Sequence, residues 1–187
     1  MARFAHGVRL PAGFPRHASV HVRKRVVPGV RGMAGKVLLM RQLIDAHGDR
    51  PELRELAFRI LRRYRVRSRD LAGYVRALQL WTQAHRYARE PGEQFAGPDA
   101  VIRQGGGDCD DLTILVGALL RAIGIPTRLE VLGWADGRGR MAYRHVYLRA
   151  GVGGIWPAVE VIHRVPLGWD PYRRTIAARR KGKAGVS

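Results

Sequence analysis

The chain has 187 residues, of which 46% are hydrophobic, and this is enough for the core of one domain, so a wholly disordered chain is excluded. Its single cysteine, Cys109, excludes an internal disulfide and a zinc site built from several cysteines. No apolar run approaches the roughly 18 residues that a membrane-spanning helix needs, and the first residues contain no continuous apolar segment of a secretory signal.

The net charge of +19 is concentrated towards the two ends of the chain. Residues 1–70 contain 17 Lys/Arg and 5 acidic residues, and residues 171–187 contain 6 Lys/Arg and no acidic residue. The stretch 71–170 is nearly neutral, with 11 Lys/Arg and 10 acidic residues. Basic flanks of this kind bind polyanions or acidic protein surfaces, or are simply solvated. We expect any contact with nucleic acid to be non-specific, because no helix-turn-helix, zinc-finger or interleaved aromatic pattern is present to read bases.

The first 70 residues predict an arm followed by helices. Residues 1–30 are interrupted by proline and glycine and predict an extended basic arm. Three stretches with helical periodicity follow, with apolar stripes over 33–44, 53–64 and 71–84. Pro51 suits the first turn of the second helix, and Asp70 suits the N-cap of the third.

The second half of the chain changes from helical to alternating periodicity. The run CDDLTILVGALLRAIG at 109–124 is apolar nearly all round and predicts a helix buried on most sides, capped by Asp108 and ended by Gly124. Strands are predicted at 143–150 and 155–162, with a turn at Asp136-Gly137. Helices followed by strands predict an α+β domain over 31–170, with an antiparallel sheet packed on the buried helix, and a basic tail at 171–187.

Cys109 lies in the first turn of the buried helix. Free N–H groups and the positive end of the helix dipole favour a thiolate there, and the glycine triplet 105–107 lets backbone and substrate approach closely. Asp108, Asp110 and Asp111 oppose a nearby anion, so the thiolate needs a positive partner. The alternative interpretation is a small buried core residue.

His145 is the candidate partner. It shares one strand face with Tyr143 and Tyr147. If Gly151–Gly154 forms a four-residue hairpin loop, Ala150 pairs with Ile155 and His145 lies directly opposite Glu160. The carboxylate would then orient one imidazole nitrogen while the other faces the thiol. A one-residue bulge would break this match, and the alternative is a strand histidine beside a surface acid.

These three groups suit acyl transfer. A thiolate attacks a carbonyl, the imidazolium protonates the leaving amine, and the acid fixes the histidine tautomer. The backbone N–H of Cys109 is a natural donor to the oxyanion, and a second donor could come from Gln104, Tyr87 or Trp81.

At these residues the chain resembles the transglutaminase-like superfamily, within the papain-like cysteine fold. The run GGGDCDDLTILVGALLRAIGIPTRLEVLG is similar to that family's nucleophile helix and following strand, RHVYLRA to its histidine strand and GGIWPAVEV to its acid strand. The helix segment LWTQAHRYAREPGEQFAGPDAVI and the later PLGWDP resemble the subgroup found in tailed bacteriophages and prophages. The resemblance covers roughly residues 30–172.

The resemblance implies roles for individual residues. Cys109 matches the nucleophile, His145 the base and Glu160 the third member, where the family commonly has aspartate. Asp170 in GWDP is the competing acid. Asp110 and Asp111 match the subgroup's DCDD motif, and we expect them to cap the helix or to tie the glycine-rich loop and the basic arms. We expect no cofactor and no metal. A divalent ion at these aspartates is the alternative, but the run lacks the glycine and terminal acid of a calcium loop.

The resemblance implies two functions. The first is a phage cysteine-dependent amide hydrolase or acyltransferase of peptidase or amidase type, acting on a peptide or isopeptide. The second is a catalytically silent virion structural protein of the capsid, portal or tail that docks through its basic arms. Either implies other phage structural subunits as partners, and a location in the virion or in the host cytoplasm during assembly.

Overall fold

The computed structural model describes residues 32–88, 95–135 and 141–173. The arm predicted at 1–30, the turn at Asp136-Gly137 and nearly all of the tail predicted at 171–187 lie outside the described residues. The elements in chain order are α1 (Met33–Gly48), α2 (Pro51–Arg63), α3 (Leu71–Gln83), β1 (Arg86–Tyr87), α4 (Pro98–Gln104), β2 (Gly106–Gly107), α5 (Cys109–Ala122), β3 (Thr127–Ala135), β4 (Met141–Ala150) and β5 (Ala158–Val159). The predicted α+β class is confirmed, and no helix of the described residues is both long and apolar enough to cross a membrane.

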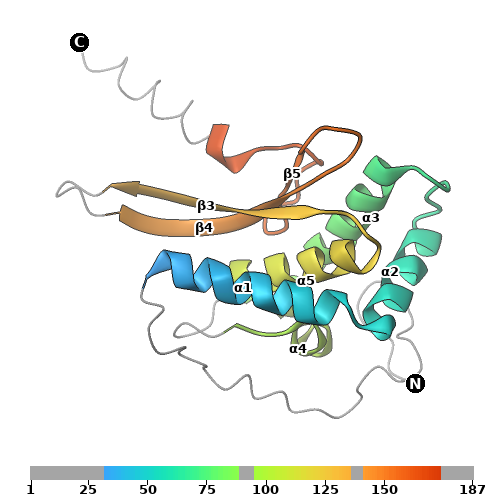
Figure 1. The fold of residues 1–187 in the computed structure, drawn as a ribbon, viewed down its shortest axis with the longest axis horizontal. Coiled ribbons are helices and arrows are strands. Elements are labelled where there is room, and N and C mark those ends of the chain that lie inside the picture. The colour runs from blue at the N-terminus through green and yellow to red at the C-terminus, as the bar shows by residue number, and fades with distance from the viewer. Residues whose placement is uncertain (1–31, 89–94, 136–140, 174–187) are drawn as a thin grey trace.

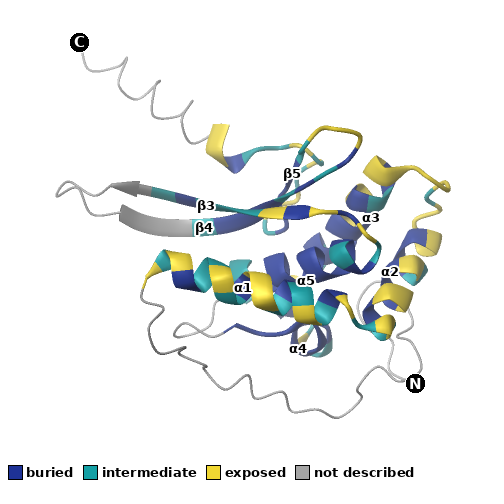
Figure 2. Cartoon of the chain, in the orientation of Figure 1, coloured by how far each residue is buried: buried dark blue, intermediate teal, exposed yellow. Residues whose placement is uncertain are grey.

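The three helices predicted in the first half are confirmed. Pro51 occupies the first turn of α2, where its missing N–H has no intrahelical acceptor to lose. Asp70 caps α3, because its carboxylate accepts a hydrogen bond of 2.7 Å from the backbone N–H of Gly73. The apolar faces of α2 and α3 are buried in the main core and their outer faces are largely exposed (Figure 2). The arginines of both helices are exposed, apart from the half-buried Arg59.

Helix α5 is the centre of the fold, as its all-round apolar pattern predicts. It contacts α1, α2, α3 and α4 as well as β4, so that helices surround it and the sheet closes one side (Figure 1). Every residue from Asp111 to Leu120 is buried. Asp108 forms the predicted N-cap as part of a capping box, and Gly124 lies just past the end of the helix at φ +79°.

The antiparallel sheet has the order β3-β4-β5. The predicted strand 155–162 is shorter than expected, because β5 contains only Ala158 and Val159. After it, the backbone N–H groups of Ile162 and His163 donate to the side chain of Glu160 instead of pairing with β4. The acid itself therefore bends the chain away from the sheet.

The hairpin between β4 and β5 differs from the prediction. Val152 pairs with Ile155, and the turn consists of two glycines, Gly153 and Gly154, at φ +54° and +83°. Positive φ at both central residues is the requirement of a tight type I′ turn. The four-residue loop and the pairing of Ala150 with Ile155 were wrong: Arg149 pairs with Ala158 and Leu148 with Val159. This moves the register by two residues, so each side chain keeps its predicted face.

The glycine triplet permits the close approach expected from the sequence, but the approach is made by the protein's own strand β1 and by Asp111. Gly105 ends α4 in the left-handed region at φ +70°, and β2 then pairs in parallel with β1. A Cβ on Gly106 would lie 2.2 Å from the carbonyl oxygen of Arg86, and one on Gly107 would lie 2.7 Å from the Cβ of Asp111. The space that a side chain would need at Gly106 and Gly107 is therefore already occupied by other parts of the protein.

We predict that Gly106→Ala lowers the free energy of unfolding by about 1–3 kcal/mol, because the new methyl must displace the backbone of β1. Urea denaturation followed by tryptophan fluorescence measures the change. Gln104→Ala, at an exposed position two residues earlier, is the control and should change stability by less than about 0.5 kcal/mol. Equal stability of the two variants would contradict the packing of β1 on β2.

Candidate functional site

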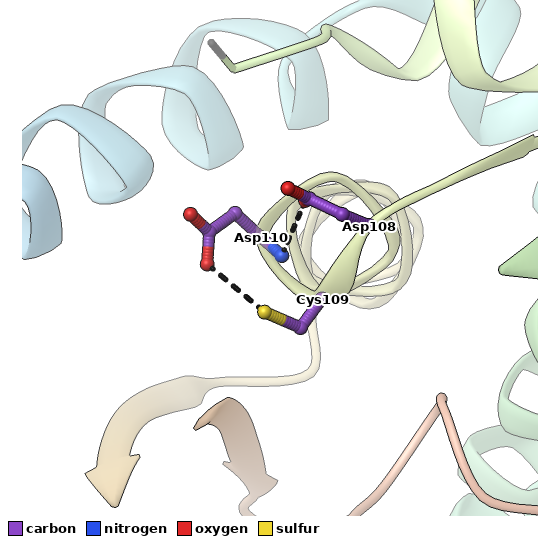
Figure 3. Close-up of side chains that lie close together, drawn as sticks. All are labelled: Asp108, Cys109 and Asp110. Carbon is purple, nitrogen blue, oxygen red and sulfur yellow. Dashed lines mark hydrogen bonds between the residues drawn. The ribbon is translucent and has the colours of Figure 1, made fainter. Parts of the chain in front are cut away.

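Cys109 begins α5 and is half-buried, against a small cluster that includes Phe95, Ile114 and Val146. Asp108 caps this first turn: its Oδ1 accepts from the N–H of Asp110 at 3.0 Å (Figure 3) and from the N–H of Asp111 at 3.3 Å. Among the described residues, no hydrogen bond uses the N–H of Cys109 itself. The helix start therefore presents a thiol and an unused backbone donor side by side.

Asp111 anchors this helix start. Its side chain is 1% exposed, accepts from the N–H of Ala96 at 2.6 Å and accepts from the N–H of Asp108 at 3.3 Å. One carboxylate thus joins the segment before α4 to the loop that precedes the nucleophile. The expectation that Asp111 caps the helix and ties the glycine-rich loop is confirmed.

The thiol of Cys109 is turned to Asp110, with its sulfur 3.5 Å from Oδ1 (Figure 3). Burial, the charges of Asp110 and Asp108 and the hydrogen bond to Asp110 together raise the pKa of Cys109 to about 12, while the N–H of Val146 acts in the opposite direction. The helix dipole, which the sequence analysis invoked in favour of a thiolate, is therefore outweighed, and the thiol keeps its proton at neutral pH.

His145 and Glu160 are joined directly. The Nε2 of His145 lies 2.6 Å from Oε2 of Glu160, a side chain with no solvent exposure. The observed register places Glu160 diagonally from His145 rather than opposite it, and the extra methylene of glutamate helps to cover that longer span. The geometry thus brings this predicted pair together by a route different from the expected one.

The Glu160 carboxylate is held in its ionised form. Burial raises its pKa, but the hydrogen bond and charge of His145 and the two backbone N–H groups of Ile162 and His163 outweigh burial, so the pKa lies below its ordinary value. A buried carboxylate in this state fixes the orientation of the imidazole.

Two glutamines that position the acid were not predicted from the sequence. Gln79 and Gln83, one turn apart on α3 and both buried, donate to the backbone carbonyl of Glu160 at 2.9 and 2.8 Å. Gln83 also donates to the carbonyls of His163 and Val165. The sequence contained a signal for this role: two glutamines lie four residues apart on the apolar face of a predicted helix. Buried amide groups need hydrogen-bond partners, so such a pair indicates a buried polar contact.

His145 uses Nε2 for the acid, which leaves Nδ1 for a second partner. The His145 ring is stacked with that of Tyr147, with 6.1 Å between the ring centroids, and its centroid lies 6.2 Å from that of His163. Within the described part of the chain, no hydrogen bond joins the imidazole to Cys109. The adjacent residue, Val146, provides the contact between this strand and the thiol.

Asp170, the competing acid, is engaged elsewhere. Its carboxylate accepts from Tyr147 Oη at 3.1 Å, from the guanidinium of Arg149 at 2.6 Å and from the N–H of Tyr172 at 3.0 Å. Burial raises its pKa, but the hydrogen bond from Arg149 and the other donors hold it below the ordinary value. Asp170 therefore fastens the segment after β5 to the sheet, and Glu160 is the acid on His145.

The three candidate oxyanion donors occupy different surroundings. Tyr87 is 49% exposed and pairs with Gly107, two residues before the nucleophile. Trp81 is 3% exposed, and its Nε1 has no hydrogen-bond partner among the described residues. Gln104 is exposed at the end of α4. Of these three residues, Tyr87 is connected to the loop before Cys109 by the pairing of β1 with β2.

Asp108, Cys109 and Asp110 could each offer one metal-ligand atom, and these atoms lie within 4.8 Å of one another. A thiol must lose its proton to bind a metal, and here the thiol donates that proton to Asp110. This arrangement by itself assigns no ion.

We predict that Cys109 reacts slowly with iodoacetamide at pH 8, because a pKa of about 12 leaves roughly one thiolate in ten thousand. The rate should rise about tenfold per pH unit towards pH 12. Asp110→Ala removes a negative charge and the acceptor, so its thiol should react faster at pH 8. Intact-mass spectrometry reads the rates, with Asp49→Ala at a distant exposed acid as the control. A wild-type thiol that titrates below pH 8.5 would contradict the geometry with Asp110.

We also predict a specific loss of stability in acid. Because the pKa of Glu160 is lowered on folding, its contribution is complete above its unfolded pKa, near 4.5, and is lost as pH falls through the folded value. The difference in unfolding free energy between wild type and Glu160→Gln should therefore shrink between about pH 5 and pH 3. Urea titrations at several pH values measure it, and a difference independent of pH would contradict an ionised Glu160.

Two solved structures are similar to the chain at low identity. One, from Cytophaga hutchinsonii and provisionally described as a cysteine protease, is 20% identical with a TM-score of 0.46, covering 66% of this chain and 44% of that one. The other, Legionella pneumophila LapG in an EGTA-treated form, is 16% identical with a TM-score of 0.38, covering 74% of this chain and 68% of that one. The chain thus spans less than half the length of the first.

No curated protein matches the sequence. The family model of the transglutaminase-like superfamily matches residues 54–161. The matched range runs from α2 to just past β5 and contains Cys109, His145 and Glu160. Because it covers more than half of the sequence and the α+β fold agrees, this chain belongs to the transglutaminase-like superfamily.

Proposed function

We propose that the chain is a cysteine-dependent amide hydrolase or acyltransferase of peptidase or amidase type, with Cys109 as nucleophile, His145 as base and Glu160 as the acid that orients the base. The observation that carries the proposal is the 2.6 Å contact between His145 Nε2 and the fully buried carboxylate of Glu160. His145 lies on β4, which packs against α5, and α5 begins with the only cysteine of the sequence. This arrangement supports acyl transfer through a thiol.

Activation requires the thiol to leave Asp110 and to meet the imidazole. The backbone N–H of Val146 lowers the pKa of Cys109 through a hydrogen bond, so the strand that carries His145 lies next to the sulfur. Rotation of the Cys109 side chain about χ1 is the smallest movement that changes its partner. In this proposal Nδ1 of His145 takes the thiol proton, and the resulting imidazolium is stabilised by the ionised Glu160.

The reaction then proceeds in two steps. The thiolate attacks the carbonyl carbon of an amide, the C–N bond breaks, and the imidazolium gives its proton to the leaving amine, which leaves a thioester on Cys109. Water or the amine of a lysine attacks this thioester, giving its proton to His145 and releasing an acid or a new amide, and the thiol is reformed. The first outcome is hydrolysis, and the second is acyl transfer.

The oxyanion of each step would be held by backbone and side-chain donors. The N–H of Cys109 is not used by the cap and supplies the first hydrogen bond. Tyr87 is the proposed second donor, because β1 places it beside Gly107 in the nucleophile loop.

A second candidate function is a catalytically silent scaffold in a phage particle. The specific observation in its favour is the thiol, whose pKa is raised to about 12 and whose hydrogen bond goes to Asp110. The phage assignment depends on the DCDD and GWDP segments, and the basic flanks at 1–70 and 171–187 suit acidic partner subunits. In this alternative the fold positions the flanks and performs no chemistry.

The discriminating experiment compares three variants on a panel of peptide and isopeptide substrates, with and without a primary amine as acceptor. Cys109→Ala should abolish turnover. Glu160→Gln should lower kcat by about 10²-fold or more, because the imidazole loses its anionic partner. Asp170→Asn removes an acid of similar burial that does not serve the base, so its kcat should stay within a few-fold of wild type.

Thermal unfolding of all three variants accompanies the assay, so that a loss of folding is distinguished from a loss of chemistry. Turnover that survives in Cys109→Ala, or that falls equally in Glu160→Gln and Asp170→Asn at equal stability, would overturn the proposed roles. Absence of turnover in the wild type across the panel would favour the scaffold.

A further inference from the structure

The connection between α2 and α3 carries an unusual concentration of charge. Five arginines occur within eight residues, and we call residues 62–69 the arginine loop: Arg62, Arg63, Arg65, Arg67 and Arg69. All five are exposed, and the loop projects from one end of the molecule (Figure 2). Within the described ranges, none of the five guanidinium groups makes an ion pair or a hydrogen bond, and the backbone N–H of Arg69 donates to Tyr74 Oη at 3.1 Å.

Several arginines elsewhere in the fold are paired with nearby acids. Arg50 contacts Asp99, Arg121 contacts both Asp45 and Asp49, and Arg149 contacts Asp170. In the arginine loop the nearest acid in sequence, Asp70, is occupied by its hydrogen bond to the N–H of Gly73. Within the part of the chain that the structure describes, the five arginines of the loop thus form a compact group of cations that are paired with no acid.

The loop is held in one shape by its own backbone. Val66 donates to the carbonyl of Leu61 at 3.1 Å and packs against the main core, and Asp70 donates to the carbonyl of Arg67 at 3.3 Å. Arg65 and Arg69 lie in the left-handed region at φ +53° and +63°, which glycine or asparagine occupies at lower cost. Arginine is thus placed where conformation alone would favour another residue.

We propose that the arginine loop is a contact site for the phosphate backbone of nucleic acid. Guanidinium groups bind phosphate oxygens through paired hydrogen bonds, and a preformed loop loses little conformational entropy on binding. The described loop offers only Tyr64 and the adjacent Leu71 as exposed large apolar residues, whereas a protein interface needs an apolar centre. A polar, strongly positive surface is the composition of a nucleic-acid interface.

The expected binding is independent of sequence and strongly dependent on salt. Apart from Arg62 and Arg63 in the last turn of α2, the loop belongs to no helix or strand that could enter a groove and set its guanidinium groups against base edges. Each phosphate neutralised adds about 0.9 to the slope of log K against log[salt] on duplex DNA. Tyr64, 38% exposed among the arginines, offers a ring on which a base of a single strand could stack.

The test uses the full chain and a fluorescein-labelled 20-base-pair duplex of arbitrary sequence, with fluorescence anisotropy at several NaCl concentrations. The loop variant is Arg65→Asn/Arg67→Gln/Arg69→Asn, in which asparagine suits the two left-handed positions and the fold should be retained. The matched control is Arg54→Gln/Arg164→Gln/Arg173→Gln, which removes the same charge from exposed positions outside the loop. Thermal unfolding checks that both variants are folded.

We expect the loop variant to weaken binding at least tenfold at 0.1 M NaCl and to lower the salt slope by about 2–3, while the control changes affinity less than threefold. Cys109→Ala should bind as the wild type does, which separates this site from the proposed catalysis. Equal weakening in both triple variants, or no wild-type binding, would overturn the proposal. Competition by poly-glutamate as effective as that by DNA would also overturn it, in favour of an acidic protein partner.

Discussion

The buried carboxylate of Asp111 is the interaction on which the arrangement of the site depends. Its two oxygens accept from the backbone of Ala96 and of Asp108, so one side chain fixes the entry to α4 and the entry to α5 relative to each other. Without it, the buried N–H of Ala96 and the part-buried N–H of Asp108, where the glycine-rich loop turns into the helix, would lose their acceptor. The position of Cys109 follows from this anchor, since the helix that it begins can start only where the cap is complete.

The same acids that build the helix start oppose its chemistry. Asp108 and Asp110 are within reach of the thiol and raise its pKa, while the capping bonds of Asp108 stabilise the first turn. A thiol in this setting is a stable neutral group until another residue takes its proton. The proposed catalysis therefore depends on a change of partner at Cys109, and the adjacent His145–Glu160 pair is already assembled to provide the new one.

Much of the fold could be predicted from the sequence, because the helices carry regular apolar stripes and recognisable caps such as Pro51, Asp70 and Asp108. The register of the β4–β5 hairpin could not, since Gly151, Gly153 and Gly154 allow loops of two or four residues equally well. The pairing of His145 with Glu160 nevertheless remained accessible, because an error of two residues preserves the face of a strand. The parallel pair β1–β2 was invisible, since two-residue strands have no periodicity.

The two glutamines of α3 connect the acid of the site to the hydrophobic core. Gln79 and Gln83 hold the main chain of Glu160 and of the segment after it, so the direction of the carboxylate is set by a helix whose other side lies in the hydrophobic core. A repacking of that core which tilted α3 would turn the acid with it. The basicity of the imidazole could thus drift during evolution through apolar substitutions far from any reacting atom, without a single change in the residues that perform the chemistry.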